Sequence, residues 1–240
     1  MVHPSSHHPS HQNSSLRSLD EKRAVVMPLE IDMPSISAII LAGGRSSRMG
    51  RNKALLKINH QRLIDHVAER LHALSNDLII VTNQPEPYEG IDARLVADVF
   101  PHHSSIVGLY SGLLAAKHEL ALVVGCDMPF LELNLLRYMV VLSTGHDAVI
   151  PRPQPERVEP LHAIYRKSCL PVIRKYLEAG DYRIVSFFPD VRVRWVEPAE
   201  IDLFDKERLS FFNVNTPQEW QWAVEQMHQR DRERRRRSRL

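Results

Sequence analysis

The chain has 240 residues, which suits one α/β domain with tails or at most two small domains. Its 43% hydrophobic and 25% charged residues are ordinary for a globular protein. The net charge of +2 depends on an arginine-rich end, so a uniformly basic nucleic-acid-binding face is not indicated. Two cysteines give no disulfide framework or zinc site. No apolar run reaches the ~20 residues that span a bilayer, and the sequence shows no signal peptide. We therefore expect a soluble cytoplasmic protein.

Three parts follow one another along the chain. Residues 1–34 are rich in Ser, His and Pro and have no hydrophobic periodicity, so we expect a disordered N-terminal extension. Residues 35–229 carry regular apolar patterns and are predicted to form the folded domain, and residues 230–240 a flexible basic tail.

In the first half of the domain, short apolar runs alternate with amphipathic segments. The spacing predicts helices at residues 63–74, 106–118 and 131–142. It predicts strands at residues 36–41, 78–82, 94–97, 120–125 and 147–150. This alternation predicts an α/β fold with a largely parallel sheet that is covered on both faces.

The second half is less regular. After a proline-rich loop at residues 151–160, we expect short strands at residues 161–165, 191–196 and 211–214. Ser168 is a candidate cap for a helix that Gly180 ends, and the Thr-Pro pair at residues 216–217 is typical of a helix start. We expect that last helix to continue through about Gln229.

The most informative segment, residues 41–53, follows the first predicted strand directly. Its glycines let backbone amides approach a ligand closely, and its basic side chains add positive charge for a polyanion such as a nucleoside triphosphate. A Walker A motif is excluded because Arg51 follows Gly50, and Gly-x-Gly-x-x-Gly is excluded because the first two glycines are adjacent. The segment is Leu41-Ala42-Gly43-Gly44-Arg45-Ser46-Ser47-Arg48-Met49-Gly50-Arg51-Asn52-Lys53.

At the carboxyl edge of the predicted sheet, where open α/β sheets bind ligands, the sequence places three polar residues. Asp127 follows the strand at 120–125, and we expect it to be a metal ligand because Mg²⁺ is commonly held by one or two carboxylates and phosphate oxygens. Asp98 is a candidate second carboxylate near it, and Asn83 a candidate contact to base or ribose; a plain turn residue is the alternative for each. For Cys126 we favour packing over nucleophilic catalysis, because no base partner is evident.

Two motifs in the second half are less specific. In residues 159–165, Glu-Pro-Leu-His-Ala-Ile-Tyr, His162 either faces a second substrate or is a hydrogen-bonded surface histidine, and we favour the surface. In residues 213–217, Asn-Val-Asn-Thr-Pro, helix capping explains the Thr-Pro pair, while Asn215 could also reach a metal or phosphate.

Together these motifs resemble the MobA family, the molybdenum cofactor guanylyltransferases, over roughly residues 37–224. The pattern Leu-Ala-Gly-Gly-Arg-x-x-Arg-Met-Gly…Lys is shared by related nucleotidyltransferases, but its combination with Cys-Asp-Met-Pro and the two motifs of the second half is much more specific. The resemblance implies a Rossmann-like three-layer sandwich that acts as a nucleotidyltransferase. It implies Mg²⁺-dependent transfer of GMP from GTP to the phosphate of molybdopterin, with pyrophosphate released.

The resemblance also implies roles for single residues. Lys53, Arg48 and Asp127 are the expected catalytic residues, because the reaction needs charge stabilisation at the α-phosphate and the leaving pyrophosphate. Partner proteins that deliver the cofactor or receive it are implied as transient contacts; neither a membrane nor a specific nucleic acid is. The implied nucleotide contacts, the last of them also the metal ligand, are Leu41, Ala42, Gly43, Lys53, Asn83, Asp98 and Asp127.

One departure from the family pattern precedes the middle helix. Family members usually carry Gly-Pro-Leu-x-Gly where this chain has Ser-Ser-Ile-Val-Gly at residues 104–108, preceded by His102 and His103. The loop that shapes the nucleotide pocket is therefore expected to differ, which leaves the nucleotide more open than the reaction type. The alternatives are CTP as donor to molybdopterin, GTP on another phosphorylated acceptor, and a non-catalytic nucleotide-binding protein of the same fold.

Overall fold

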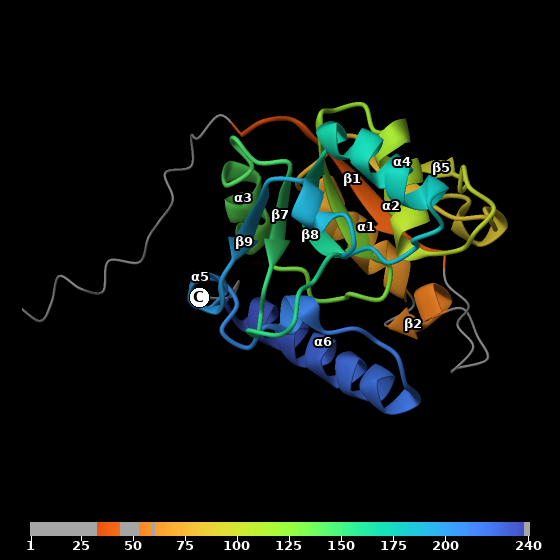
Figure 1. The fold of residues 1–240 in the computed structure, drawn as a ribbon. Helices are drawn as coiled ribbons and strands as arrows, with labels where there is room; N and C mark the ends of the chain where they lie inside the picture. The colour runs from red at the N-terminus through yellow and green to blue at the C-terminus, as the bar shows by residue number, and fades with distance from the viewer. Residues whose placement is uncertain (1–32, 44–52, 59–60, 238–240) are drawn as a thin grey trace, which may run out of the picture. The chain divides into compact units, whose positions relative to one another are not determined.

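A seven-stranded sheet organises the part of the chain that the computed structural model describes, residues 33–43, 53–58 and 61–237 (Figure 1). The strand order is β5-β4-β1-β6-β8-β7-β9, and only β8 runs against its neighbours, since it pairs antiparallel with both β6 and β7. The α/β fold with a mostly parallel sheet is thereby confirmed. The strands are β1 (Ile36–Leu41), β4 (Leu78–Val81), β5 (Arg94–Val96), β6 (Leu120–Gly125), β7 (Ala148–Pro151), β8 (His162–Arg166) and β9 (Val193–Val196).

Helices cover both faces of this sheet. Ile40 and Leu122 belong to one buried cluster that includes residues of α1, α3 and α5, whereas Ile39 and Val123 belong to a second cluster that includes residues of α2 and α4. Successive residues of a strand point to opposite faces, so continuous apolar strands fill both clusters and give the three layers. The helices are α1 (Leu63–His72), α2 (Ser105–Ala115), α3 (Leu133–Val141), α4 (Leu170–Glu178), α5 (Pro198–Ile201) and α6 (Pro217–Arg237).

The helix α2 lies unusually close to the central strand β1. A Cβ atom at Gly112 would lie 2.7 Å from Cγ2 of Ile39, and one at Gly108 would lie 3.3 Å from Cδ2 of Leu41. These two glycines therefore allow α2 to pack directly against β1. The close packing sets the first turn of α2 beside the carboxyl end of that strand.

A short hairpin and two terminal segments complete the description. The strands β2 (Lys57–Ile58) and β3 (Gln61–Arg62) pair antiparallel just before α1, which the sequence patterns did not predict. Residues 1–32 and 238–240 lie outside the described residues, so the expected N-terminal extension is not tested. Within the described ranges, no helix is both long and apolar enough to cross a bilayer.

Three expectations for the second half were wrong. The expected strand at residues 211–214 is a 3-10 turn, Leu209–Phe211, followed by an unpaired stretch. Ser168 does not cap α4, because its hydroxyl donates to Oδ1 of Asp147 at 2.7 Å; Gly180 ends the helix as predicted, with a φ of 78°. The last helix, α6, continues past Gln229 to Arg237, so most of the expected tail is helical.

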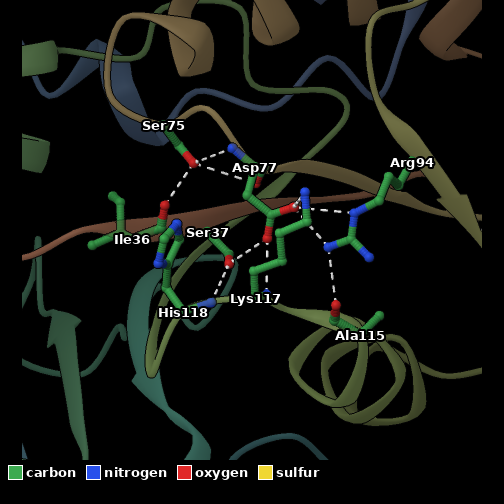
Figure 2. Close-up of polar contacts among 8 residues, drawn as sticks. All are labelled: Ile36, Ser37, Ser75, Asp77, Arg94, Ala115, Lys117 and His118. Carbon is green, nitrogen blue, oxygen red and sulfur yellow. Dashed lines mark hydrogen bonds and ion pairs between the residues drawn. The ribbon is translucent and has the colours of Figure 1, made fainter.

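Asp77 lies at the amino ends of the strands, where it joins three neighbouring strands and a helix (Figure 2). Its Oδ2 accepts from the hydroxyl of Ser37 in β1 at 2.6 Å and from the backbone N–H of Lys117 at 2.9 Å. Its Oδ1 accepts from Nε and Nη2 of Arg94 in β5 at 3.0 and 2.7 Å, and Arg94 also donates to the last-turn carbonyl of α2 at Ala115. This cluster fixes the sheet at the edge opposite to the candidate site.

Candidate functional site

The carboxyl ends of four parallel strands meet at one edge of the sheet. The strand pairing continues one residue past β1 and β6, since the N–H of Ala42 donates to Val81 at 3.0 Å and that of Cys126 to Leu41 at 3.2 Å. Beyond this point the chain leaves the core, because Leu41 is buried, Ala42 is half-buried and Gly43 is exposed. Among the described residues, a Cβ atom at Gly43 would meet nothing within 4 Å. The described part of the chain therefore leaves the carboxyl end of β1 uncovered.

Most of the glycine-containing segment at residues 41–53 lies outside the described residues. Residues 44–52, which include Arg48, lie outside the described residues, and Lys53 is described only by its backbone, at the start of the 3-10 turn Lys53–Leu55. The expected phosphate contacts of Arg48 and Lys53 therefore stay predictions.

Next to β6, Asp127 borders a cavity of about 310 Å³. Asp127 is half-buried, and its backbone carbonyl accepts from the N–H of Val214 at 3.0 Å, which brings the segment before α6 to the cavity. The cavity has an apolar wall that includes Met128, Leu161 and Ile184. Its polar lining consists of Ser105, Asp127, Glu159, Asn213 and Asn215.

Glu159 is the second carboxylate at the cavity, and its pKa depends on the charge of Asp127. It is 7% exposed, burial raises its pKa above the ordinary value, and the negative charge of Asp127 adds to this rise. The charge of Arg157, which lies 2.6 Å from Oε1 of Glu159, opposes both effects. The sequence motif placed Glu159 before a strand but gave no sign of this pairing, because the two carboxylates are brought together only by β8 lying beside β6.

Asp98 does not pair with Asp127 as expected. The strands β4 and β1 lie between β5 and β6, so the ends of β5 and β6 are three strand spacings, roughly 14 Å, apart. Asp98 instead contacts Asn83, whose Nδ2 donates to Oδ2 of Asp98 at 2.7 Å. His103 joins them through Nδ1, 3.1 Å from the same Nδ2. Two predicted positions, Asn83 and Asp98, therefore do lie together, with a histidine that the prediction did not include in the site.

The residues before α6 are held by a capping box. Oε2 of Glu219 accepts from the backbone N–H groups of Asn215 and Thr216 at 2.7 and 2.8 Å, and Oγ1 of Thr216 accepts from the N–H of Glu219 at 3.1 Å. This confirms the predicted helix start. Because the same box orients Asn215 at the cavity, the alternative that its side chain reaches a ligand is also compatible with the fold.

His162 is neither at the surface nor in the cavity. It is fully buried in β8, and its ring packs edge-to-face on Phe211 at 4.8 Å between centroids. Neither ring nitrogen has a hydrogen-bond partner among the described residues. The preceding residues, Glu159 to Leu161, line the cavity. The strand β8 therefore begins at His162, one residue later than the expected strand at residues 161–165.

We expect His162→Leu to be at least as stable as the wild type and less sensitive to acid. Burial lowers the pKa of His162 from 6.5 to about 3, so between these pH values the unfolded chain binds a proton that the folded chain does not. The free energy of unfolding of the wild type is therefore unaffected by this histidine's titration above pH 6.5 and falls as the pH drops from 6.5 towards 3, by about 1.4 kcal/mol per unit. Urea unfolding of both proteins at pH 7 and pH 5 tests this. An equal loss of stability on acidification in the variant would contradict the assignment.

Comparison with known proteins identifies the relatives of this chain. A family model described as "MobA-like NTP transferase domain" matches residues 38–193. The "Molybdenum cofactor guanylyltransferase" of Desulfosudis oleivorans is 36% identical over 193 residues, which cover 80% of this chain and 95% of the relative. The "Probable molybdenum cofactor guanylyltransferase" of Pelotomaculum thermopropionicum is 36% identical over 185 residues, which cover 77% and 90% of the two chains.

Solved structures with a similar fold include a protein named for molybdopterin-guanine dinucleotide biosynthesis. Molybdopterin-guanine dinucleotide biosynthesis protein A from Archaeoglobus fulgidus superposes with a TM-score of 0.71 at 26% identity and covers 81% of this chain and 100% of that one. The 2-C-methyl-D-erythritol 4-phosphate cytidylyltransferase from Thermus thermophilus has a TM-score of 0.59 at 18% identity, over 79% and 97% of the two chains. The second likeness shows the fold alone.

Proposed function

The chain belongs to the MobA-like NTP transferase family of nucleotidyltransferases, and on this premise we propose that it transfers GMP from GTP to the phosphate of molybdopterin. The products are the guanine dinucleotide form of the cofactor and pyrophosphate. The observation that carries the proposal is the 36% identity to a molybdenum cofactor guanylyltransferase along 95% of that protein. The cavity beside Asp127, at the edge where the parallel strands end, supplies a place for the reaction.

Nucleotidyl transfer to a phosphate requires positioning of the reactants and stabilisation of charge more than it requires a strong base. The acceptor phosphate is already ionised near neutral pH, so one of its oxygens attacks the α-phosphorus of GTP in line while the bond to pyrophosphate breaks. Backbone N–H groups after β1 are proposed to hold the triphosphate, and Lys53 and Arg48 to stabilise the charge on the leaving pyrophosphate. Asp127 and the polar residues of the cavity are proposed to orient the reacting groups.

The residues at the cavity fit a magnesium ion. No group of three His, Cys, Asp or Glu side chains that could hold a metal occurs among the described residues. Mg²⁺ needs no such cage, because it commonly binds one or two carboxylates together with substrate phosphates and water. Asp127 would hold the ion, and oxygen ligands in the cavity are of the hard type that Mg²⁺ prefers. When bound, Mg²⁺ would neutralise charge on the phosphates of GTP.

We expect GTP to be used with a kcat/KM at least about tenfold above that of CTP, a modest factor for a site that reads base donors and acceptors. The fold itself does not decide this, since a cytidylyltransferase shares it; the preference follows from the identity to guanylyltransferases. Pyrophosphate release with GTP, CTP, ATP and UTP, each with and without molybdopterin, measures it. Equal or faster release with CTP would contradict the choice of base. No release with any nucleotide would favour a non-catalytic binding protein.

We also propose a cytoplasmic setting for this activity, since a chain with two cysteines and no disulfide framework suits a reducing compartment. Transient contacts with proteins that deliver molybdopterin or receive the finished cofactor remain part of the proposal. Their test is co-purification with molybdoenzyme partners.

A further inference from the structure

The candidate site has two ends on either side of β1. On the β6 side, Asp127 and Glu159 border the cavity. On the β4 side, Asn83 and Asp98 follow the ends of β4 and β5. A triphosphate held after β1 would therefore direct its nucleoside to one of these ends, and the two carboxylates of the cavity make that end the place for a metal and the reacting phosphates.

We propose that His103 is a positioning residue for the nucleoside, because it fixes Asn83 so that Asp98 presents its Oδ1 to an N–H or O–H donor of the nucleoside. This inference rests on the proposed function and adds a residue for nucleotide recognition to it. His103 lies in the loop between β5 and α2, the loop in which this chain departs from the family pattern.

The hydrogen bonds around Asn83 fix its side chain completely. Its Oδ1 accepts from the backbone N–H of Asp98 at 2.9 Å, which settles the orientation of the amide. Its Nδ2 then lies 2.7 Å from Oδ2 of Asp98 and 3.1 Å from Nδ1 of His103, and an amide nitrogen has two hydrogens to donate. Both hydrogens are used, so Asn83 has no donor left for a nucleotide. Asn83 orients Asp98 and does not itself donate to the ligand.

The same geometry assigns the tautomer of His103. Because Nδ2 of Asn83 is a donor, Nδ1 of His103 has to accept, and the ring proton is on Nε2. Nδ1 is 3.7 Å from Oδ2 of Asp98, too far for a direct hydrogen bond between them. His103 therefore acts on Asp98 only through Asn83.

Asp98 has one carboxylate oxygen, Oδ1, that can accept a hydrogen bond from a ligand. Its side chain is 10% exposed, and its Oδ1 is buried without a hydrogen-bond partner among the described residues. In the same loop, the buried Oγ of Ser104 also has no partner among the residues that the structure describes. A buried carboxylate oxygen without a donor is costly, so a ligand donor is the simplest way to satisfy it. Base N–H groups and ribose hydroxyls are the donors that a nucleoside carries.

The loop that carries His103 is anchored on both sides. The N–H of Val99 donates to Oγ of Ser111 in α2 at 3.0 Å, and the ring of Phe100 packs on Tyr110 with centroids 5.6 Å apart. His102 stacks on Tyr182 at 3.7 Å between centroids. His103 itself is exposed, with 70% of its side chain accessible, so its substitution leaves these anchors in place.

The test uses two variants of His103 in the full chain. His103→Phe keeps a ring but removes the acceptor, and His103→Gln restores an acceptor oxygen that can reach Nδ2 of Asn83. We expect His103→Phe to raise the Kd and KM for GTP roughly five- to tenfold with kcat nearly unchanged, and His103→Gln to recover most of this loss. His72→Phe, at an exposed histidine that ends α1, is the matched control and should bind GTP as the wild type does.

A double-mutant cycle then shows whether His103 acts through Asp98. On an Asp98→Asn background, His103→Phe should have little further effect on the Kd for GTP, because the oxygen that it positions is already altered. Inosine triphosphate lacks the 2-amino group of the base, and 2′-deoxy-GTP and 3′-deoxy-GTP each lack one ribose hydroxyl, so the penalty of His103→Phe should vanish only for the analogue that lacks the donor. A penalty that persists with all three analogues assigns the donor to N1–H of the base, which all of them keep. Full additivity in the cycle, or wild-type affinity of His103→Phe, would overturn the role of His103. Failure of the wild type to bind GTP at all would overturn the proposed function itself.

Discussion

Asp127→Asn should lower kcat by about 10²-fold or more while the protein stays folded. Asp127 follows β6 at the carboxyl edge of the sheet, is half-buried and borders the cavity rather than the core. A carboxylate there would repel a triphosphate unless a cation lay between them, and the charge of Asp127 would hold that cation. Asn keeps the shape and one oxygen but loses the charge.

The same substitution should leave thermal stability unchanged or raise it. The negative charge of Asp127 raises the pKa of the buried Glu159, so removing that charge relieves repulsion between the two side chains. Asp98, the expected second carboxylate, takes no part in this repulsion, because it lies on the far side of β1 and β4. Steady-state kinetics over a Mg²⁺ series and thermal melting measure both effects, with Asp92→Asn, at an exposed aspartate, as control. Normal turnover at saturating Mg²⁺ would mean that the metal is held elsewhere, and unfolding would mean that Asp127 is a structural turn residue.

We expect Asp77→Ala to lower the free energy of unfolding by about 3 kcal/mol without changing kcat. Asp77 is 2% exposed and accepts from Ser37, Lys117 and Arg94 (Figure 2). Its removal leaves the hydroxyl of Ser37 and the N–H of Lys117 without their acceptor. Arg94 is 40% exposed and regains water, which keeps the loss below that of a fully buried ion pair. The cluster lies at the amino ends of the strands, so the chemistry at the opposite edge is untouched.

The dependence on pH gives a second readout of Asp77. Burial alone would raise the pKa of Asp77, but the hydrogen bonds from Ser37, Lys117 and Arg94 outweigh burial and hold the pKa below its ordinary value of 3.8. Its contribution to stability is therefore complete above pH 3.8 and is lost as the pH falls through the lowered pKa. Urea unfolding of wild type, Asp77→Ala and the shape-conserving Asp77→Asn at pH 7 measures the loss, and the difference between wild type and Asp77→Ala should shrink when the pH is lowered through the pKa of Asp77. A loss below about 0.5 kcal/mol in the alanine variant, the level of a surface substitution, would contradict the role of the cluster.

The strongly periodic elements could be predicted from the sequence. The strands β1 and β6 begin and end at the predicted residues, because a run of six consecutive apolar or small residues fits a strand that is buried on both faces. The expected strand at residues 211–214 failed for a tertiary reason: Val214 donates to the carbonyl of Asp127 instead of joining the sheet. The position of β8 between β6 and β7, and with it the burial of His162, depends on long-range pairing that local periodicity does not encode.

The candidate site could be predicted in the parts that follow strands. Asn83 and Asp98 were expected near a ligand because each follows the end of a strand, and the structure does place them together. Glu159 and His103 lie in loops, and their partners are separated from them by long stretches of sequence, so only the fold shows that Glu159 senses the charge of Asp127 and that His103 contacts Asn83. For Arg48 and Lys53, the expected phosphate contacts stay predictions.

The transfer itself is best measured with GTP that carries a radioactive label on its α-phosphorus, incubated with the full chain, Mg²⁺ and molybdopterin. We expect the label to enter a product that contains both molybdopterin and GMP, with one pyrophosphate released for each product formed and no turnover when the acceptor is left out. Label that is found only in free GMP, or that is released equally with and without molybdopterin, would contradict guanylyl transfer to this acceptor.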